Sequence, residues 1–175
     1  MNEFHDLLLR RHSIRRYTDE PLDATDVKTI LEAALLAPTS KNARSWHFTV
    51  VENRSLLEQL AECKPLYAHP IAKAPLAVVV SANPEKSEAW IEDASVAAAF
   101  IHLQVEALGL GSCWIQVRGR MHDDEVTSSD WVKDLLHIDA AEQVVCILSI
   151  GHKNEERRPV DPEKLKWDHV TIAGE

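Results

Sequence analysis

Cysteine is scarce in this sequence. The 175 residues include three cysteines, Cys63, Cys113 and Cys146, and no two of them form a CxxC pair. Isolated cysteines in an odd number indicate neither a disulfide framework nor a cysteine-based zinc site. Cys113 and Cys146 lie in apolar runs, so we expect them to be buried thiols.

Long apolar runs are absent as well. No stretch approaches the roughly 18 apolar residues of a membrane-spanning helix. The N-terminal MNEFHDLLLRRHS is amphipathic and lacks the apolar centre and small-residue cleavage site of a secretory signal. We therefore expect a cytoplasmic protein with no membrane partner.

Positive charge is in deficit. Nineteen Lys and Arg stand against 28 Asp and Glu, a formal net charge of -9, which argues against nucleic acid as the main partner. Repeats and low-complexity segments are also missing, and 45% apolar with 27% charged residues is an ordinary globular composition. The length suits a single domain over residues 1–175.

The apolar residues that are present follow helical and strand patterns. Helices are predicted at 2–11, 23–37, 55–63, 87–108 and 129–136, and strands at 46–52, 76–82, 112–117 and 144–151. The run LAVVVSA at 76–82 is typical of a central, fully covered strand, and the polar tail from residue 152 is expected to be extended. The alternation predicts an α/β or α+β fold with a small central sheet, but it does not give the order of the strands.

Basic side chains gather near the N-terminus in spite of the acidic composition. RRHSIRR, at residues 10–16, follows the first predicted helix and combines guanidinium, imidazole and hydroxyl donors. Arginine offers a rigid fork of donors that suits a phosphate, so this segment is a candidate anion site. The simpler interpretation is a solvated helix end, where cations are favoured by the helix dipole.

A second polar segment, PTSKN at residues 38–42, directly precedes the strand WHFTVV. Loops that lead into buried elements often hold ligands, although Pro38 could equally end the helix while its polar neighbours satisfy a turn.

Glycine marks two further segments. GLG at residues 109–111 follows a helix, whereas a dinucleotide fingerprint follows a strand and opens a helix, so we interpret it as a helix-ending turn. Gly151 ends the last strand, and Lys153, Arg157 and Arg158 then add positive charge to what would alone be a solvated tail.

Taken together and in this order, these segments resemble the nitroreductase family. The resemblance rests on RRHSIR, on APTSKN before WHFTVV, on a long helix closing in GLGSCWI, and on ILSIGH with a basic tail. It covers nearly the whole chain and implies an α+β (α/β sandwich) fold, with a small, mainly antiparallel central sheet flanked by helices. It also implies a homodimer with FMN at the interface, and the alanine-rich helix at 87–108 suits tight packing against a second copy.

The resemblance further implies a composite cofactor site. The residues implied to hold the FMN phosphate, ribityl chain and pyrimidine edge from one subunit are Arg11, His12, Ser13 and Arg15. Those implied to meet the flavin ring from the other subunit are Pro38, Thr39, Ser40 and Asn42. The residues implied beside the ring, where a backbone N–H can meet flavin N5, are Ile115, Gln116 and Val117. Those implied to complete the phosphate pocket are Gly151, Arg157 and Arg158.

By the same resemblance, the protein is an NAD(P)H-dependent, FMN-dependent oxidoreductase. NADH or NADPH would pass hydride to flavin N5, and a small acceptor such as a nitroaromatic or quinone would then take the electrons in an alternating, ping-pong cycle. Arg15 is the candidate for stabilising the reduced flavin, and no catalytic residue or metal is assigned. Arg44 and Ser45 stand where many relatives have Gln-Pro, so the loop over the flavin and the choice of substrate could differ.

Other functions stay open at this point. The acceptor and the choice between NADH and NADPH cannot be read from the sequence, and a specialised family reductase or dehydrogenase would share the same features. An FMN-binding sensor or storage module with little turnover is a non-enzymatic alternative. A metalloenzyme or a nucleophilic hydrolase has less support, because nine histidines form no HExxH motif and Ser112 and Cys113 lack a GxSxG context.

Overall fold

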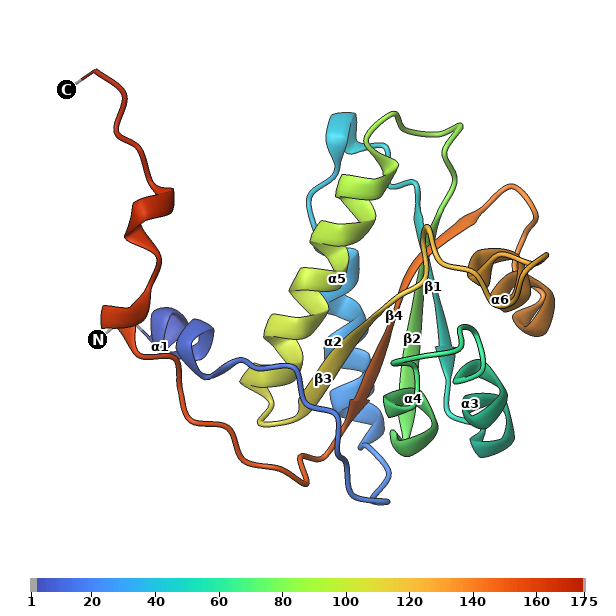
Figure 1. Ribbon diagram of the computed structural model, residues 1–175, viewed down its shortest axis with the longest axis horizontal. Coiled ribbons are helices and arrows are strands. Elements are labelled where there is room, and N and C mark those ends of the chain that lie inside the picture. The colour runs from blue at the N-terminus through green and yellow to red at the C-terminus, as the bar shows by residue number, and fades with distance from the viewer. Residues whose placement is uncertain (1–2, 175) are drawn as a thin grey trace.

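Four strands form one antiparallel sheet in the computed structural model, which describes residues 3–174 (Figure 1). They are β1 (Trp46–Val51), β2 (Leu76–Ala82), β3 (Gly111–Gln116) and β4 (Gln143–Gly151). Their order is β1-β2-β4-β3, and each neighbouring pair is antiparallel. The continuously apolar β2 is therefore central and fully buried, as its sequence predicts, and β3 lies at an edge.

Helices cover both faces of the sheet (Figure 1). Within residues 3–174 they are α1 (Glu3–Arg10), α2 (Ala24–Leu35), α3 (Arg54–Leu60), α4 (Pro70–Lys73), α5 (Trp90–Ala107) and α6 (Ser128–Leu136). α2 and α5 pack on one face, where Ile101 of α5 meets the side of the sheet that carries Val78. α3, α4 and α6 pack on the other face, which carries Val79. Successive side chains of β2 thus point to opposite faces of the sheet and contribute to both cores of an α/β sandwich, which is the expected fold class.

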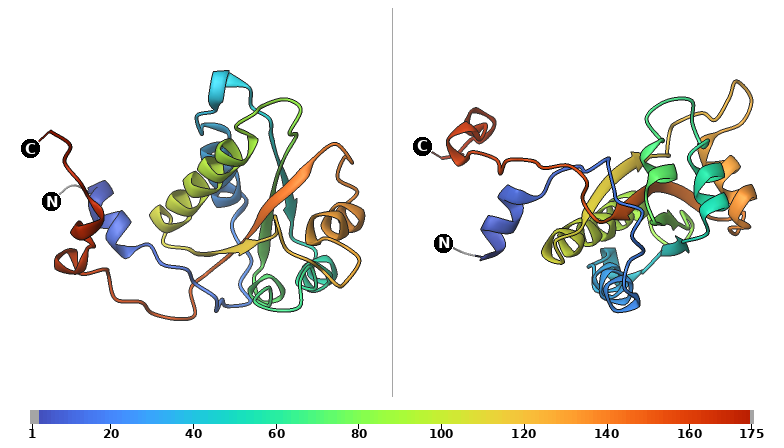
Figure 2. Two further views of the ribbon diagram at one scale, coloured as in Figure 1. Left: turned by 45° about the horizontal axis from the view of Figure 1, so that its top comes forward. Right: turned by 90° about the horizontal axis from the view of Figure 1, so that it is seen from below.

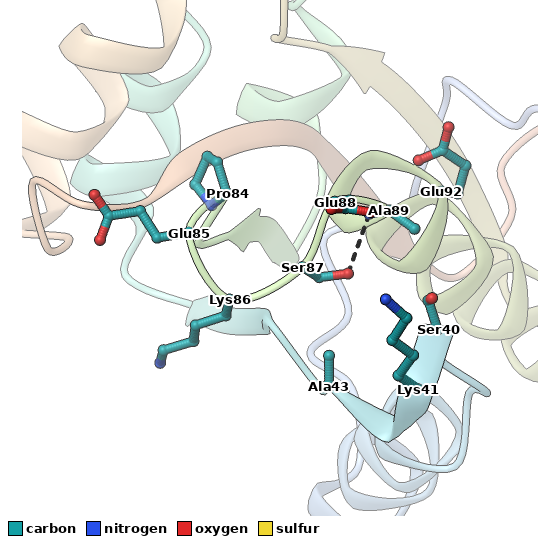
Figure 3. Close-up of a pocket in the computed structure, with 10 residues that line it drawn as sticks. All are labelled: Ser40, Lys41, Ala43, Pro84, Glu85, Lys86, Ser87, Glu88, Ala89 and Glu92. Atoms are coloured by element: carbon teal, nitrogen blue, oxygen red, sulfur yellow. Dashed lines mark hydrogen bonds between the residues drawn. The ribbon is translucent and has the colours of Figure 1, made fainter.

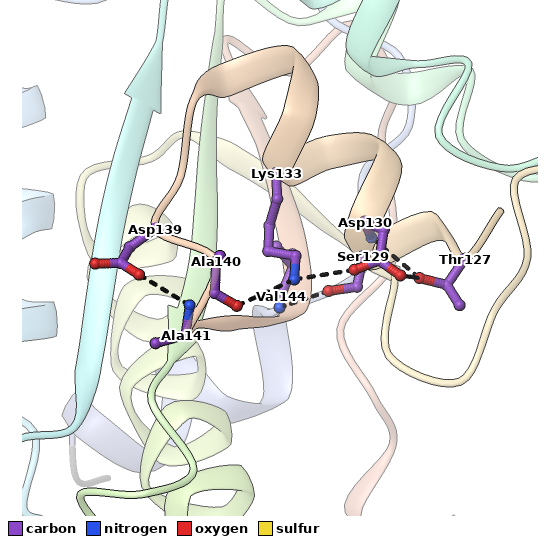
Figure 4. Close-up of polar contacts among 8 residues, drawn as sticks. All are labelled: Thr127, Ser129, Asp130, Lys133, Asp139, Ala140, Ala141 and Val144. Atoms are coloured by element: carbon purple, nitrogen blue, oxygen red, sulfur yellow. Dashed lines mark hydrogen bonds and ion pairs between the residues drawn. The ribbon is translucent and has the colours of Figure 1, made fainter.

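A polar network ties α6 to the start of β4 (Figure 4). Thr127 caps α6 by accepting the Asp130 N–H at 3.0 Å, and Lys133 pairs with Asp130 at 2.9 Å. The buried Ser129 hydroxyl accepts the Val144 N–H at 3.0 Å. Because β4 pairs with both β2 and β3, this network helps to hold the edge strand on which the candidate site is built.

The structure departs from the sequence-based expectations in several places, besides shifts of one or two residues at the ends of elements. α3 ends at Leu60 rather than at residue 63. α5 begins at Trp90 rather than at residue 87, and the short α4 was not predicted. Four residues are too few for a helical period to be visible in the sequence. The tail, expected to be extended, contains two 3-10 turns, η2 (Pro162–Lys164) and η3 (Trp167–His169), and the Asp161 side chain caps η2 by accepting the Glu163 N–H.

The tail and α1 lie together, away from the sheet (Figures 1 and 2). The Val160 N–H donates to the Leu9 carbonyl at 2.8 Å, which joins the two segments. Both carry exposed apolar side chains, among them Phe4, Leu8, Trp167 and Ile172. No helix within residues 3–174 is both long enough and apolar enough to cross a membrane.

Candidate functional site

Residues 11–17, which we call the strap, run along the start of the edge strand β3. Ser13 forms a parallel bridge with Ser112, and the Ile14 N–H donates to the Ser112 carbonyl at 2.9 Å. Ile14 is 2% exposed and presses against Gly111, where a Cβ would come within 2.8 Å of the Ile14 side chain. The apolar residue inside the basic segment is therefore its anchor, and the absence of a side chain at Gly111 permits the close approach.

The far end of the strap is fixed by Tyr17. Its hydroxyl donates to the Ile14 carbonyl at 2.6 Å and lies 2.8 Å from the Ser149 hydroxyl in β4. Burial raises the pKa of Tyr17, so the phenol stays protonated and serves as a donor. A Cβ at Gly151 would come within 2.6 Å of Pro75 and 3.0 Å of Tyr17, so Gly151 leaves room for this packing.

A buried histidine supports the strap from α5. His102 Nδ1 shares a hydrogen bond of 2.6 Å with the Ser112 hydroxyl. Burial, and secondarily the nearby Arg11 charge, lowers the pKa of His102 to about 4, so its ring is neutral near pH 7. His12, by contrast, donates from Nδ1 to the Arg10 carbonyl at 2.8 Å, so that ring nitrogen is engaged within its own segment.

Glu155 joins the strap to the segment after β4. Its carboxylate accepts the backbone N–H groups of Arg15 at 2.6 Å and Arg16 at 3.3 Å, and it pairs with Arg157 at 2.9 Å. These donors, led by the Arg15 N–H, hold the pKa of Glu155 below its usual value. Of these donors, only the Arg157 guanidinium is a side-chain group that the sequence suggests for a phosphate, and here it is paired with a carboxylate of the same chain. Arg158, in the same segment, is exposed.

A buried ion pair lies next to this group. Lys153 binds both carboxylate oxygens of Glu106 at 2.9 Å, and Glu106 is 7% exposed. Both residues line a cavity of about 750 Å³ that also borders Arg10 and Arg157. Glu106 and Glu155 were not singled out from the sequence, because acidic residues are common in this chain and their partners are distant along it.

The three residues proposed at the end of β3 differ in exposure. Ile115 and Val117 are buried in the core facing α3, α4 and α6, so they can offer a ligand only backbone groups. Gln116 is half-buried: its carbonyl accepts from the Lys64 ammonium at 2.9 Å, and its side chain links the Trp114 indole to the Arg118 carbonyl. Partial burial lowers the pKa of Lys64.

A basic pocket of about 510 Å³ opens beside Gln116. We define the basic pocket by its four cationic side chains, Arg15, Lys64, Arg118 and Arg120. Tyr67, Cys113 and Trp114 also line it, and burial raises the pKa of the Cys113 thiol. Of the residues that line this pocket, sequence reasoning assigned Arg15 and Gln116 to the cofactor site.

The second predicted segment, residues 38–44, lies elsewhere and is called the loop below. The Ser40 N–H donates to the carboxylate of Asp93, in the first turn of α5, at 2.8 Å, and the Ser87 hydroxyl donates to the same carboxylate at 3.1 Å. Asp93 is 5% exposed, whereas Pro38, Ser40 and Asn42 are exposed and Thr39 is half-buried.

The loop has an unusual backbone. It contains a 3-10 turn, η1 (Ser40–Asn42), and Lys41, Asn42 and Arg44 have φ values of 51°, 56° and 47°. Non-glycine residues rarely adopt positive φ, and such conformations gather at ligand sites. A cavity of about 580 Å³ separates this loop from the segment that leads from β2 into α5 (Figure 3).

The strap and the loop do not meet within one chain. The loop contacts the first turn of α5, while the strap pairs with the residues that follow its last turn (Figure 1). α5 has 18 residues and is about 27 Å long, at a rise of about 1.5 Å per residue. One chain therefore brings together the strap, the end of β3 and the segment after β4, but not residues 38–42.

Comparison with known proteins identifies the family. The nitroreductase family model matches residues 8–64 and 59–152. The chain therefore belongs to the nitroreductase family. A solved FMN-dependent nitroreductase from Clostridium difficile is 41% identical to it, covers 97% of this chain and 98% of its own, and superposes with a TM-score of 0.95.

Two further proteins extend the comparison. An Archaeoglobus fulgidus protein, named as a candidate NADH dehydrogenase/NAD(P)H nitroreductase, is 32% identical over 161 residues, which is 90% of this chain and 89% of that protein. A nitroreductase from Desulfitobacterium hafniense, solved with bound FMN, is 21% identical, covers 98% of both chains, and shares the fold with a TM-score of 0.76. Within residues 3–174, no group of three or more His, Cys, Asp or Glu side chains could hold a metal ion.

Proposed function

We propose that this chain is an FMN-dependent oxidoreductase that transfers hydride from NADH or NADPH to a small acceptor, such as a nitroaromatic or quinone. The observation that carries the proposal is the meeting of the strap, the start of β3 and the segment after β4, which brings Arg15 and Arg157 together around Glu155. The Clostridium difficile protein, 41% identical over almost the whole chain, is an FMN-dependent nitroreductase.

The residues present fit FMN. Arg11, Arg157 and Arg158 would bind its phosphate, because guanidinium groups match phosphate oxygens. His12 and Ser13 would face the ribityl chain, and Arg15 the pyrimidine edge. Gly151 contributes by leaving space for Tyr17. When bound, FMN supplies the hydride chemistry, and the protein supplies position and charge.

At the end of β3, the proposed contacts are made by the backbone. The side chains of Ile115 and Val117 are buried, whereas Gln116 borders the basic pocket. A positive charge at Arg15 would stabilise negative charge that develops on the pyrimidine edge of the cofactor during reduction. Three unpaired cysteines suit a reducing compartment, and we expect the enzyme to work in the cytoplasm.

The working unit is proposed to be a homodimer. Pro38, Thr39, Ser40 and Asn42 could reach a flavin held by the strap only from a second chain, because within one chain they lie at the opposite end of α5. The exposed apolar side chains of α1 and the tail support this arrangement: Trp167 is 68% exposed and Ile172 is 69% exposed. Apolar surface of this kind usually marks an interface.

The test is an anaerobic absorbance spectrum of the purified protein reconstituted with FMN, recorded before and after adding NADH or NADPH separately. We expect the flavin band to bleach and then to return when a nitroaromatic or quinone is added. Sedimentation of the same sample should give a dimer. FMN that binds without bleaching would support the sensor or storage alternative, and failure to bind FMN would overturn the proposal.

A further inference from the structure

The basic pocket concentrates positive charge in an acidic chain. The net charge is -9, yet four cationic side chains line one pocket of about 510 Å³, and its lining residues within 3–174 include no carboxylate. Positive charges gathered in this way repel one another. An anion bound between them would offset this repulsion by attracting each of them.

The charges of this pocket are also unpaired. Across the described chain, no side-chain ion pair involves Arg15, Lys64, Arg118 or Arg120. Glu155, the carboxylate that meets the strap, is already engaged with the Arg15 and Arg16 backbone and with Arg157. The pocket therefore keeps its donors available to a ligand from solution.

Three of the cations lie beyond the cofactor contacts proposed above. Lys64 is held near Gln116 by its bond of 2.9 Å to the Gln116 carbonyl, which uses one of three ammonium donors. Arg118 lies over the Trp90 ring at 5.7 Å, and the pocket reaches on to Arg120. Tyr67, which is 79% exposed, adds an aromatic surface on the same rim.

We propose that the electron acceptor is a planar aromatic compound with an anionic substituent, whose negative group binds between Lys64, Arg118 and Arg120. This inference rests on the proposed function, because it places the reacting ring beside a flavin held near Arg15 and Gln116. The pocket suits an acceptor better than the extra phosphate of NADPH, because that phosphate lies at the end of the molecule remote from the nicotinamide. Attraction by the pocket would raise both the affinity and the rate of encounter.

The experiment uses the FMN-loaded protein and a pair of acceptors that differ in charge, 4-nitrobenzoate and 4-nitrobenzamide. Bleaching by NADH and by NADPH is recorded first. Dissociation constants for benzoate and benzamide, which are not reduced, are then measured from changes in the flavin spectrum. We expect the anionic compound to be favoured by roughly tenfold in both kcat/KM and binding, the scale of a charge-assisted contact, and the preference to shrink at high salt.

Variants test whether the preference for the anionic acceptor comes from the basic pocket. Arg118→Gln and Arg120→Gln should each reduce the preference for the anion severalfold, Arg120→Lys should retain it, and Lys28→Gln, which removes an exposed cation on α2, should leave it unchanged. If bleaching is normal but neither charge nor variant matters, this inference is wrong and the proposed function stands. If Arg118→Gln changes only the preference for NADPH over NADH, and not the preference for the anionic acceptor, the acceptor assignment is overturned. If the protein does not bind FMN, or its flavin does not bleach, both proposals fail.

Discussion

The strap and the loop, the two segments proposed to meet the flavin, are held in opposite ways. The strap is fixed at its middle and at its far end by buried groups, with Ile14 packed on Gly111 and Tyr17 bound to Ser149. The loop is mostly exposed, has three residues at positive φ, and is fastened to the rest of the chain at Asp93. Substitutions of the strap's buried residues, Ile14 and Tyr17, should therefore lower stability, and those in the loop should change the geometry offered to a ligand.

The largest effect is expected at Ile14. Ile14→Ala removes a side chain that is 2% exposed, and the neighbouring Gly111 has no side chain to fill the space. We expect the free energy of unfolding to fall by about 2–5 kcal/mol, as measured by urea denaturation followed by circular dichroism. Ile14→Val is the matched control and should cost much less. A small loss for Ile14→Ala would mean that the strap is not anchored there.

The second effect concerns pH and His102. Its folded pKa of about 4 lies below the ordinary value of 6.5, so between these values the unfolded chain binds a proton that the folded chain does not. Stability contributed by neutral His102 is therefore complete above pH 6.5 and is lost as the pH falls toward 4, at up to about 1.4 kcal/mol per pH unit. Urea unfolding at several pH values should show a shallower decline in His102→Gln than in the wild type. Identical slopes would contradict the prediction.

Asp93 tests how the loop is held. Asp93→Ala leaves the Ser40 N–H and the Ser87 hydroxyl without their buried acceptor, which should cost about 1–3 kcal/mol. Asp93→Asn retains an acceptor oxygen and should cost less. Thermal unfolding gives the stabilities, and FMN fluorescence gives the affinity of each variant. Two variants as stable as the wild type, with unchanged FMN affinity, would show that the loop is held by other contacts.

Arg11 separates binding from folding within the strap. Its side chain is half-buried, so Arg11→Ala should change stability little while weakening FMN binding by roughly 1–3 kcal/mol, the scale of a charged hydrogen bond. Arg54→Ala, which removes an exposed arginine on α3, is the control. Titration of the apoprotein with FMN measures both. Equal affinities for the two variants would remove Arg11 from the phosphate site.

The sequence predicts the fold better than it predicts the site, for a physical reason. β2 and β4 are read directly from their apolar runs, because a strand covered on both faces needs apolar side chains on both. Strand order depends on packing between distant segments and cannot be seen in a local pattern. Glu155 illustrates the same limit in the site, since it meets Arg15 from 140 positions away.

Residue type alone also leaves some roles hidden. A basic segment suggests that its cations matter most, yet the strap is positioned by Ile14, the apolar residue within it. For Gly151, which the resemblance assigns to the phosphate pocket, the structure shows a packing role next to Tyr17 and Pro75 that the sequence did not reveal. Conversely, Lys64 and Arg120 are unremarkable in the sequence and line one pocket only because the segment after α3 lies beside the end of β3.

The smallest effect on stability, and the sharpest test of the loop, is expected at Asn42. Glycine tolerates its φ of 56°, so Asn42→Gly removes the side chain, including an exposed bond of 3.0 Å from Arg44, with a stability change within about 0.5 kcal/mol. Asn42→Ala adds backbone strain of about 1 kcal/mol at the same position. If Asn42 meets the flavin, both variants should alter the rate of bleaching by NADH severalfold, independently of stability. If its role is confined to the turn, the flavin of Asn42→Gly should bleach at the wild-type rate and only Asn42→Ala should lose stability. That result would mean that the loop has only a structural role.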